Sequence, residues 1–514
     1  MTKCEIYCII KQKAVLLLIT GHFMDAIRKI LTSEKENGRV YTPEFVVQNI
    51  LDLSGYFGAE ILKKHIIDNS CGDGAFLCEV VKRYCNEMAK KGASADEIRS
   101  DLEAFVHGID IDSSERSKCM TNLDRAVKDF GVENVAWDIL CADALCVHKY
   151  DGKMDFVLGN PPYVRVHNLG DSFSEVKNLR FAQHGMTDLY IAFYEIGIKM
   201  LSEKGVLGYI TPSSFFNSLA GGYMRKTLVR ENLLDKVVDF GHFQAFRATT
   251  YNAIVILKRE RNGNSVDYYR FDEKNRIPYY VDSLLPSDYF VSDNFYFSEK
   301  KALDSLSDIL CNAGKCDISV KNGYATLCDN VFVHDFDFDS KFVIPVVKAS
   351  RGIKKKIFFP YDRSGHLYSE AELRTDEKMY TYLCENKQRL VKRSNENDRE
   401  KFWFAFGRSQ AINDTYKDKL SVNALVRTET DFKFVDAPSG TGVYGGLYIL
   451  CDKISPKEVK KALASKEFIS YVSLLGKYKS GGYYTFSSKD VKTFLDYIFA
   501  YDGGLFSCLQ TNSF

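Results

Sequence analysis

A loop of two prolines flanked by an amide and a phenol carries the strongest chemical signal in this sequence. Asn160-Pro161-Pro162-Tyr163 follows the apolar run 156–158, which is typical of a strand buried on both faces of a parallel sheet. Neither proline can donate an N–H, so the strand should stop in a stiff loop. The Asn160 amide oxygen and the Pro161 carbonyl could hold both hydrogens of one planar amine while Tyr163 stacks on its ring. This combination indicates an exocyclic amine on a heteroaromatic base, with an incidental proline-rich turn as the alternative.

A glycine-rich turn lies upstream, between a short strand ending at Asp68 and a helical pattern that begins near 76. The turn contains Ser70, Cys71, Gly72 and Gly74. Glycines at such a position let a ligand approach the backbone beside a helix N-terminus. The G-x-G spacing alone is a weak signal, because ordinary turns also have it.

Acidic residues end the next two predicted strands. The run 104–112 contains Asp110, at a place where a carboxylate can accept both hydroxyls of a ribose. The run 135–143 ends at Asp143, which could accept from an adenine amino group or cap the next turn. A solvated strand end is the alternative for Asp110.

A Thr-Pro pair marks an earlier helix start. Thr42 is predicted as the N-cap and Pro43 as the first helical residue, with an apolar helical pattern over 45–53. Free N–H groups at a helix start can hold a carboxylate, although the pattern taken alone favours a plain capped helix.

The composition is that of a globular protein of several domains. The chain has 514 residues, 45% hydrophobic and 27% charged, and 69 basic residues balance 68 acidic ones for a net charge of +1. Any basic surface must therefore be local. The 14 cysteines form no C-x-x-C pair, which favours reduced thiols over a disulfide framework or a zinc site. No stretch is long enough to span a membrane.

The first residues require a separate interpretation. Residues 14–20 resemble a short signal core without a cleavage site, and 25–33 has the pattern of a short amphipathic helix. We expect translation to begin at Met24, which makes 1–23 a misassigned start or a flexible extension.

The order of these features over 38–257 resembles the gamma-class amino-methyltransferases. Those enzymes modify adenine N6 in DNA with S-adenosylmethionine (SAM), and they include the modification enzymes of restriction–modification systems. The resemblance implies an α/β fold: a Rossmann-like SAM-dependent methyltransferase sheet with helices on both faces, plus a C-terminal α+β target-recognition domain. We expect the catalytic domain over 24–262 and the DNA target-recognition domain over 263–514, with the boundary in the polar segment 259–265.

The resemblance also implies individual roles. Asn160 and Pro161 would hold the target N6, and Tyr163 and Phe246 would sandwich the flipped adenine, unless Phe246 is simply a buried loop residue. Pro162 completes the catalytic motif. The implied cofactor-binding residues are Tyr41, Thr42, Pro43, Asp68, Ser70, Cys71, Gly72, Gly74, Asp110, Ile111, Asp143, Ala144 and Asn160. The sequence departs from the family at Asn69, where proline is common, and at Ala144, where some relatives have an aromatic residue.

The second half of the chain contains basic residues among aromatic ones, a composition that suits phosphate contact but also occurs on solvated faces. The candidate DNA-binding residues are Lys348, Arg351, Lys354, Lys355, Lys356, Arg408 and Tyr483. The expected partner is double-stranded DNA, and a separate cognate restriction endonuclease is a candidate partner. We expect a monomer in the cytoplasm of a prokaryote that needs neither a membrane nor a metal.

Three other functions share parts of this pattern. An N-P-P-Y enzyme could methylate a glutamine amide in a protein, or an adenine in ribosomal RNA. The chain could also be a DNA-binding subunit without activity of its own. The long C-terminal region argues against the first, the order of the motifs against the second, and the intact N-P-P-Y loop and glycine turn against the third.

Overall fold

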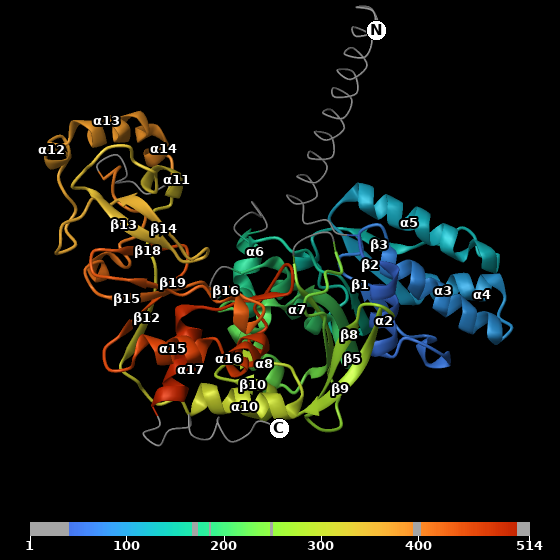
Figure 1. The fold of residues 1–514 in the computed structure, drawn as a ribbon. Helices are drawn as coiled ribbons and strands as arrows, with labels where there is room; N and C mark the ends of the chain where they lie inside the picture. The colour runs from blue at the N-terminus through green and yellow to red at the C-terminus, as the bar shows by residue number, and fades with distance from the viewer. Residues whose placement is uncertain (1–40, 167–172, 184–186, 247–249, 394–401, 501–514) are drawn as a thin grey trace, which may run out of the picture. The chain divides into compact units, whose positions relative to one another are not determined.

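The computed structural model describes residues 41–166, 173–183, 187–246, 250–393 and 402–500 (Figure 1). The predicted start at Met24 and the helix predicted over 25–33 lie outside the described residues. The chain divides into two compact units, residues 1–300 and 301–514. Within the described residues, no helix is long and apolar enough to cross a membrane.

The first unit is built on one sheet of nine strands in the order β3-β2-β1-β4-β5-β7-β6-β8-β9. Neighbouring strands from β3 to β5 are parallel, whereas β7 runs antiparallel to both β5 and β6. The strands are β1 Ile66–Asp68, β2 Val106–Asp110, β3 Asp138–Cys141, β4 Met154–Gly159, β5 Leu201–Pro212, β6 Leu234–Asp239, β7 Asn252–Lys258, β8 Val266–Asp272 and β9 Ile277–Leu284.

The order 3-2-1-4-5 is that of a doubly wound sheet, and it reverses between β1 and β4. These two strands are in register at Ile66↔Phe156 and Ile67↔Val157. Every residue of β1 is buried, because helices cover both faces of the sheet here. The loops after β1 and β4 therefore leave the same edge of the sheet side by side.

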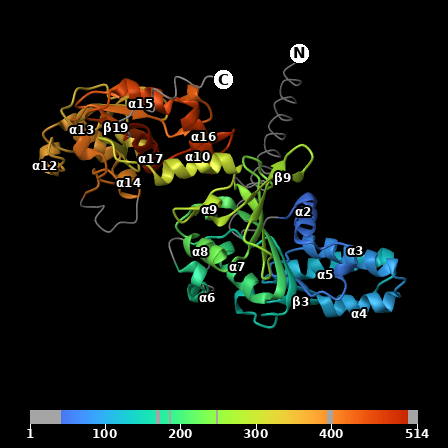
Figure 2. The same cartoon turned by 90° about the horizontal axis from the view of Figure 1, so that it is seen from below.

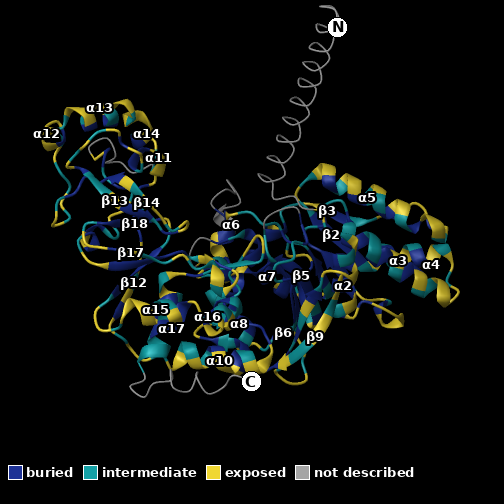
Figure 3. Cartoon of the chain, viewed as in Figure 1, coloured by how far each residue is buried: buried dark blue, intermediate teal, exposed yellow. Residues whose placement is uncertain are grey.

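Helices cover both faces of this sheet. Figures 1 and 2 show α2, α3 and α5 on one side and α6, α7 and α8 on the other. The outward faces of α3 to α5 are exposed, as Figure 3 shows, which is the amphipathic pattern of helices that cover a sheet. The helices of the first unit are α2 Glu44–Ser54, α3 Ala75–Lys90, α4 Ala95–Phe105, α5 Ser113–Val127, α6 Phe173–Asn178, α7 Leu189–Met200, α8 Gly222–Arg230 and α9 Pro286–Tyr289. The next helix, α10 Lys300–Cys311, begins at the boundary and belongs to the second unit.

The first unit ends later than the sequence indicates. We predicted the boundary at 262/263, but the units divide at 300/301. The reason is that β8 pairs in parallel with β6, and β9 then pairs with β8, so the segment 266–284 extends the sheet of the first unit. The strands β6 and β7 form an antiparallel pair within the sheet, and β8 and β9 continue the sheet beyond β6.

The second unit contains three small sheets, with orders β12-β19-β15-β17, β14-β13-β18 and β16-β21-β20. An aromatic core that includes Trp403, Phe404 and Phe406 also contains buried residues of β13 and β14. Its strands are β12 Ile318–Asn322, β13 Val343–Lys348, β14 Ile353–Phe358, β15 Lys419–Val422, β16 Leu425–Val426, β17 Val435–Ala437, β18 Gly442–Tyr444, β19 Leu447–Cys451, β20 Tyr478–Lys479 and β21 Tyr483–Thr485. Its helices are α11 Asp329–Phe332, α12 Glu370–Leu373, α13 Glu377–Glu385, α14 Lys387–Val391, α15 Pro456–Leu463, α16 Lys466–Leu474 and α17 Ser488–Phe499.

Candidate active site

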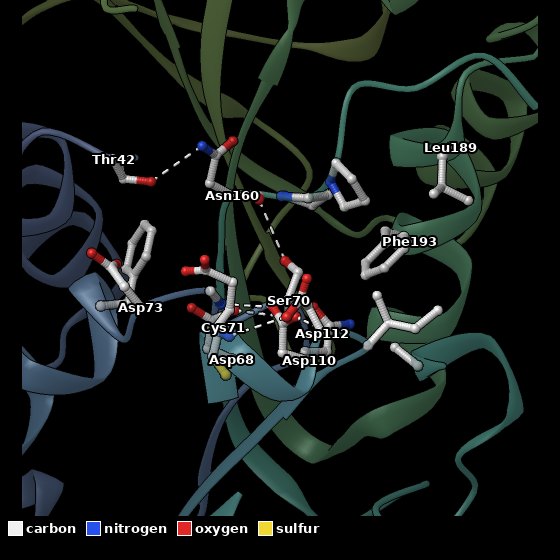
Figure 4. A pocket seen from close by; sticks show the side chains of 18 of the residues that line it. Thr42, Asp68, Ser70, Cys71, Asp73, Asp110, Asp112, Asn160, Leu189 and Phe193 are labelled. Atoms are coloured by element: carbon white, nitrogen blue, oxygen red, sulfur yellow. Dashed lines mark hydrogen bonds between the residues drawn. The ribbon is translucent and has the colours of Figure 1, made fainter. Parts of the chain in front are cut away.

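A cavity of about 390 Å³ lies where the strand order of the first unit reverses (Figure 4). Its size is within the range of small-molecule sites, and this edge is where doubly wound sheets bind ligands. Of the residues predicted from the sequence, those lining it are Tyr41, Thr42, Asp68, Ser70, Cys71, Gly72, Asp110, Ile111, Asp143, Ala144, Asn160, Pro161, Pro162 and Tyr163. Pro43, Gly74 and Phe246 do not line it.

The glycine turn after β1 is held in a conformation that side chains disfavour. Gly72 and Gly74 have φ angles of +52° and +89°. A Cβ on Gly74 would lie 2.8 Å from the Cys119 Sγ of α5, whereas a Cβ on Gly72 would meet no protein atom within 4 Å. Gly74 therefore lets α3 pack against α5, whereas Gly72, which lines the cavity, has open space where a side chain would be.

The carboxylate of Asp110 is fixed at the end of β2. Its Oδ2 accepts from the Gly72 N–H at 2.8 Å, and its Oδ1 accepts from the Asp112 N–H at 2.8 Å. Burial raises the pKa of this carboxyl despite both hydrogen bonds. Each oxygen keeps further acceptor capacity, which a ribose diol could use. The next residue, Ile111, lines the cavity and is 68% exposed.

Asp68 is the most deeply buried acid of the cavity. It is 2% exposed, and burial raises its pKa to about 8, although Oδ1 accepts from the Ser70 N–H at 3.0 Å. Gly159 at the end of β4 lies against this carboxyl, so closely that a Cβ there would be 2.6 Å from Oδ1. The β1 acid and the start of the N-P-P-Y loop are thus packed directly on each other.

Asn69, at the position where the resembling family commonly has proline, makes a buried side-chain contact with β5. Its side chain is buried, and Oδ1 accepts from the Tyr209 hydroxyl of β5 at 2.9 Å. The amide thus links the glycine turn to β5, on the far side of β4.

The N-P-P-Y loop follows β4 and turns into the cavity. The Asn160 backbone carbonyl accepts from the Ser70 hydroxyl at 3.3 Å, which links this loop to the glycine turn. The Asn160 Nδ2 donates to the Thr42 Oγ1 at 3.1 Å, and Figure 4 shows the amide nitrogen turned towards Thr42. Pro161 and Pro162 line the cavity beside Asn160, as the sequence predicts.

Thr42 differs from its predicted role as a helix cap. The helix α2 begins at Glu44 with Pro43 as its N-cap, and this residue makes no side-chain capping hydrogen bond. Pro43 is thus the N-cap of α2 and not, as the sequence predicts, its first helical residue. Because the Thr42 hydroxyl is not bound to the helix start, it accepts from Asn160 instead.

The Tyr163 ring is anchored at its hydroxyl end. That hydroxyl donates to the Ile210 carbonyl at 3.1 Å and accepts from the Asn252 Nδ2 at 3.3 Å, and burial raises its pKa well above the usual value. The Phe246 ring packs edge-on against Tyr163, with ring centroids 6.2 Å apart and planes at 72°. Phe246 is only 6% exposed and belongs to the core of the unit. It has the position of the buried loop phenylalanine that the sequence left as an alternative.

Asp143 caps the next turn, which is one of the two roles that the sequence allows, and it also lines the cavity. Its Oδ1 accepts from the Leu145 N–H at 3.0 Å and so caps the short helix η3, Ala144–Cys146, while the residue also lines the cavity. Leu189 and Phe193 of α7 line the cavity too (Figure 4). Sequence reasoning missed them, because apolar residues of a helix buried all round carry no signal that distinguishes a cavity wall from a core.

The basic residues of the second unit lie on different elements. Lys348 is at the end of β13, with its Nζ 5.7 Å from the centre of the Tyr444 ring. Arg408 forms an isolated bridge with Ala325, and Tyr483 of β21 lies beneath the Arg427 guanidinium, 5.3 Å from its ring centre. Arg427 was not predicted, since nothing in the sequence places it beside an aromatic ring 56 positions later.

The three consecutive lysines of β14 do not form one surface. Side chains alternate along a strand, so Lys354 and Lys356 share one face while Lys355 lies on the other, opposite Val346. This strand is the outer strand of its sheet. Lysines on an outer strand also discourage pairing with other chains, which is an alternative reason for their presence. Arg351 is exposed in the turn that joins β13 to β14.

Comparisons with known proteins point to restriction–modification enzymes. Residues 75–246 match the Eco57I restriction-modification methylase family. The chain is 29% identical over 247 residues to the Type II methyltransferase M.BstVI of Geobacillus stearothermophilus, covering 46% of this chain and 44% of that protein. It is 24% identical over 493 residues to the Type II restriction enzyme and methyltransferase RM.Eco57I of Escherichia coli, covering 75% and 49%. The chain thus spans about half the length of these relatives or less.

Solved structures of similar fold come from the same class of systems. The Type IIL restriction-modification enzyme MmeI in complex with DNA matches with a TM-score of 0.61 at 14% identity, over 92% of this chain and 66% of that one. A nuclease-deletion mutant of the Type ISP enzyme LlaGI with a DNA substrate mimic matches with a TM-score of 0.51 at 13% identity, over 80% and 41%. At these identities the likeness concerns the fold alone.

Proposed function

We propose that this chain, which carries an Eco57I restriction-modification methylase domain, transfers a methyl group from SAM to the N6 amine of an adenine in a specific DNA sequence. It would act in the cytoplasm of a prokaryote as a monomer, as the modification enzyme beside a separate cognate restriction endonuclease. The relatives named Type II methyltransferases support a modification activity, and the N-P-P-Y loop supports an exocyclic amine as the target.

The cavity at the end of β1 fits the cofactor. SAM supplies a methyl group on a sulfonium when it is bound. The open space beside Gly72 lets a ligand approach the backbone, and the fixed Asp110 carboxylate can accept from the ribose hydroxyls. The exposed Ile111 side chain lines the cavity, where packing against a flat ring would remove its apolar surface from water. Asp143 would accept from the amine of that ring.

The loop after β4 fits the target base. Asn160 and Pro161 present acceptor oxygens at the cavity wall, and Tyr163 offers an anchored ring for stacking. Holding both amine hydrogens would favour a pyramidal N6 whose lone pair is free to attack the methyl carbon. An adenine inside a duplex cannot reach this wall, so the base must leave the stack at a cost of about a few kcal/mol. Phe246 would then support Tyr163 from its edge rather than complete a sandwich.

The second unit is proposed to bind the duplex around the target. Lys348, Arg351 and Arg408 offer cations for phosphate contact, and Tyr483 offers an aromatic ring. Lys354 and Lys356 can contact one phosphate backbone together. Lys355 faces the other way and would contribute less.

The single observation that carries this function is the meeting of the N-P-P-Y loop and the glycine turn at one cavity, joined by the hydrogen bond from Ser70 to Asn160. The test is to express the chain in a host without adenine methylation and to map modified bases across the genome. We expect N6-methyladenine within one recurring short sequence, and none with Asn160→Ala. A wild-type strain without any N6-methyladenine would refute the proposal.

A further inference from the structure

The loop after β5 presents an apolar side chain to solvent at the edge of the sheet where the cavity lies. The strand β5 runs parallel to β4, so this loop, residues 213–222, leaves the sheet at the same edge as the N-P-P-Y loop. It begins with the short helix η7, Ser213–Phe216, and ends where α8 starts. Between these two helices, Leu219 is 82% exposed, more than any other large apolar residue that the structure describes.

The backbone of this loop is held from within. Arg225 of α8 is only 3% exposed, and its Nη1 donates to the Phe215 carbonyl at 2.5 Å and to the Ser218 carbonyl at 2.8 Å. A Cβ on Gly221 would lie 2.5 Å from the Phe215 carbonyl oxygen, so the chain passes this point only as glycine. A single exposed leucine is common on protein surfaces, but Leu219 is carried by a backbone that is fixed on both sides.

The same loop packs on the aromatic residues that support Tyr163. The Ser214 hydroxyl lies 3.2 Å from the Tyr190 hydroxyl of α7, and the two share a hydrogen bond. The Tyr190 ring packs edge-on against the Tyr163 ring, with centroids 6.2 Å apart and planes at 81°. Phe215 also packs on Tyr190, with centroids 6.5 Å apart. The loop that carries Leu219 and the ring that would stack on the target base are therefore built on one packed cluster.

An adenine that leaves the duplex opens a space in the base stack, and the flat faces beside that space lose their stacking partner. Apolar side chains, leucine among them, can enter between base steps and cover such faces. We infer that Leu219 is a positioning residue for methyl transfer, which enters the base stack as the target adenine leaves it and so stabilises the extruded state. This inference rests on the proposed function and adds a DNA contact made by the first unit.

The test compares wild type with Leu219→Ala on two duplexes, one with the target adenine paired to thymine and one with it opposite an abasic site. On the paired duplex, we expect the single-turnover rate of methylation at saturating DNA to fall about 10-fold, because the apolar surface that would be buried is lost. Opposite the abasic site the adenine leaves the stack easily, so the two rates should agree within about 2-fold. Leu219→Met, which keeps an apolar side chain of similar length, should restore the rate on the paired duplex.

A matched control comes from the opposite edge of the sheet. Leu285 is 44% exposed and follows β9, which runs in the direction opposite to β5. Leu285→Ala should methylate both duplexes as wild type does. In Leu219→Ala, the Kd for SAM and the midpoint of thermal unfolding should also equal the wild-type values, because this side chain is exposed and does not line the cavity.

Fluorescence of 2-aminopurine at the target position reports extrusion without any methyl transfer. This base becomes brighter when it leaves the stack, so the rise on binding should be at least about 2-fold smaller with Leu219→Ala than with wild type on the paired duplex. Opposite an abasic site the two proteins should give equal rises. A residue that only supports the fold would not distinguish the two duplexes.

Several results would overturn the inference. An unchanged rate in Leu219→Ala on the paired duplex would do so, and would leave this leucine as a surface for a partner protein. An equal loss on both duplexes, an altered Kd for SAM, or no rescue by Leu219→Met would mean a role in the fold or in general DNA binding. A wild-type protein that methylates no DNA would refute the proposed function itself, whereas an active wild type with any of these results refutes only the role of Leu219.

Discussion

The buried carboxyl of Asp68 should make the stability of the first unit depend on pH. Burial raises its pKa from 3.8 to about 8, so the folded protein keeps this proton over a range in which the unfolded chain has lost it. Between about pH 4 and pH 8 the folded state binds more protons than the unfolded state. The contribution of Asp68 to stability is therefore largest below pH 4 and is lost as the pH rises towards 8.

The magnitude follows from the two pKa values. Each pH unit between them lowers the free energy of unfolding by about 1.4 kcal/mol, so the full loss by pH 8 is about 5 kcal/mol. Asp68→Asn removes the titration and keeps an oxygen that can accept from the Ser70 N–H. We expect this variant to gain stability relative to wild type by about 1 kcal/mol for each pH unit between pH 5 and pH 7.

The assay is urea unfolding of wild type and Asp68→Asn at pH 5, 6, 7 and 8, followed by a probe in the first unit. Asp129→Asn, at an exposed position after α5, serves as the control and should show no such trend. A difference between Asp68→Asn and wild type that stays constant from pH 5 to pH 8, or that shrinks as the pH rises, would show that Asp68 is ionised in the folded protein.

Three other substitutions follow from the same geometry. Gly159→Ala would place a Cβ 2.6 Å from the Asp68 carboxyl. We expect this variant to lose methylation and about 1–3 kcal/mol of stability, seen as a lower midpoint of thermal unfolding. An active, equally stable variant would contradict this packing. Ile111→Ala should raise the Kd for SAM about 10-fold in a binding titration. Thermal stability should stay unchanged, because this residue is 68% exposed. An unchanged Kd would remove Ile111 from the cofactor site. Arg351→Ala should reduce the slope of log K against log salt concentration for DNA binding by about 1. Lys341 is an exposed cation before β13, and Lys341→Ala should leave the slope unchanged. Equal slopes for both variants would remove Arg351 from the DNA contacts.

The parts of the fold that sequence patterns predicted are those with strong local signals. The strand that ends at the N-P-P-Y loop and the helix after the glycine turn are both present, because apolar runs and helical spacing are properties of a single segment. The match of residues 75–246 to the Eco57I restriction-modification methylase family agrees with the class of enzymes that the order of motifs indicated. The parallel sheet was also predicted correctly.

The errors concern interactions between distant segments. The strands β8 and β9 extend the first sheet through pairing with β6, and no local pattern reveals which sheet an added strand joins. Thr42 has the sequence context of a helix cap, yet its partner is Asn160, on another element. The lysines of β14 look like one basic run, but the alternation of a strand divides them between two faces.

The sequence indicated the polar residues that meet at the cavity more clearly than the apolar residues that form its wall. Asp68, Asp110 and Asn160 lie at the ends of neighbouring strands, and the topology of a parallel sheet brings such ends together. Phe246 and Phe193 show where sequence signals no longer distinguish one position from another. Both are apolar residues with similar sequence signals, yet Phe193 lines the cavity and Phe246 lies in the core.

The most direct test of the central claim uses the purified chain, duplex DNA that carries the mapped site, and SAM with an isotope-labelled methyl group. After digestion of the DNA to nucleosides, mass spectrometry identifies the base that holds the label. We predict labelled N6-methyladenine with wild type and none with Asn160→Ala, while both proteins bind SAM with similar Kd. Label on cytosine, or equal labelling of adenine by Asn160→Ala, would contradict the account.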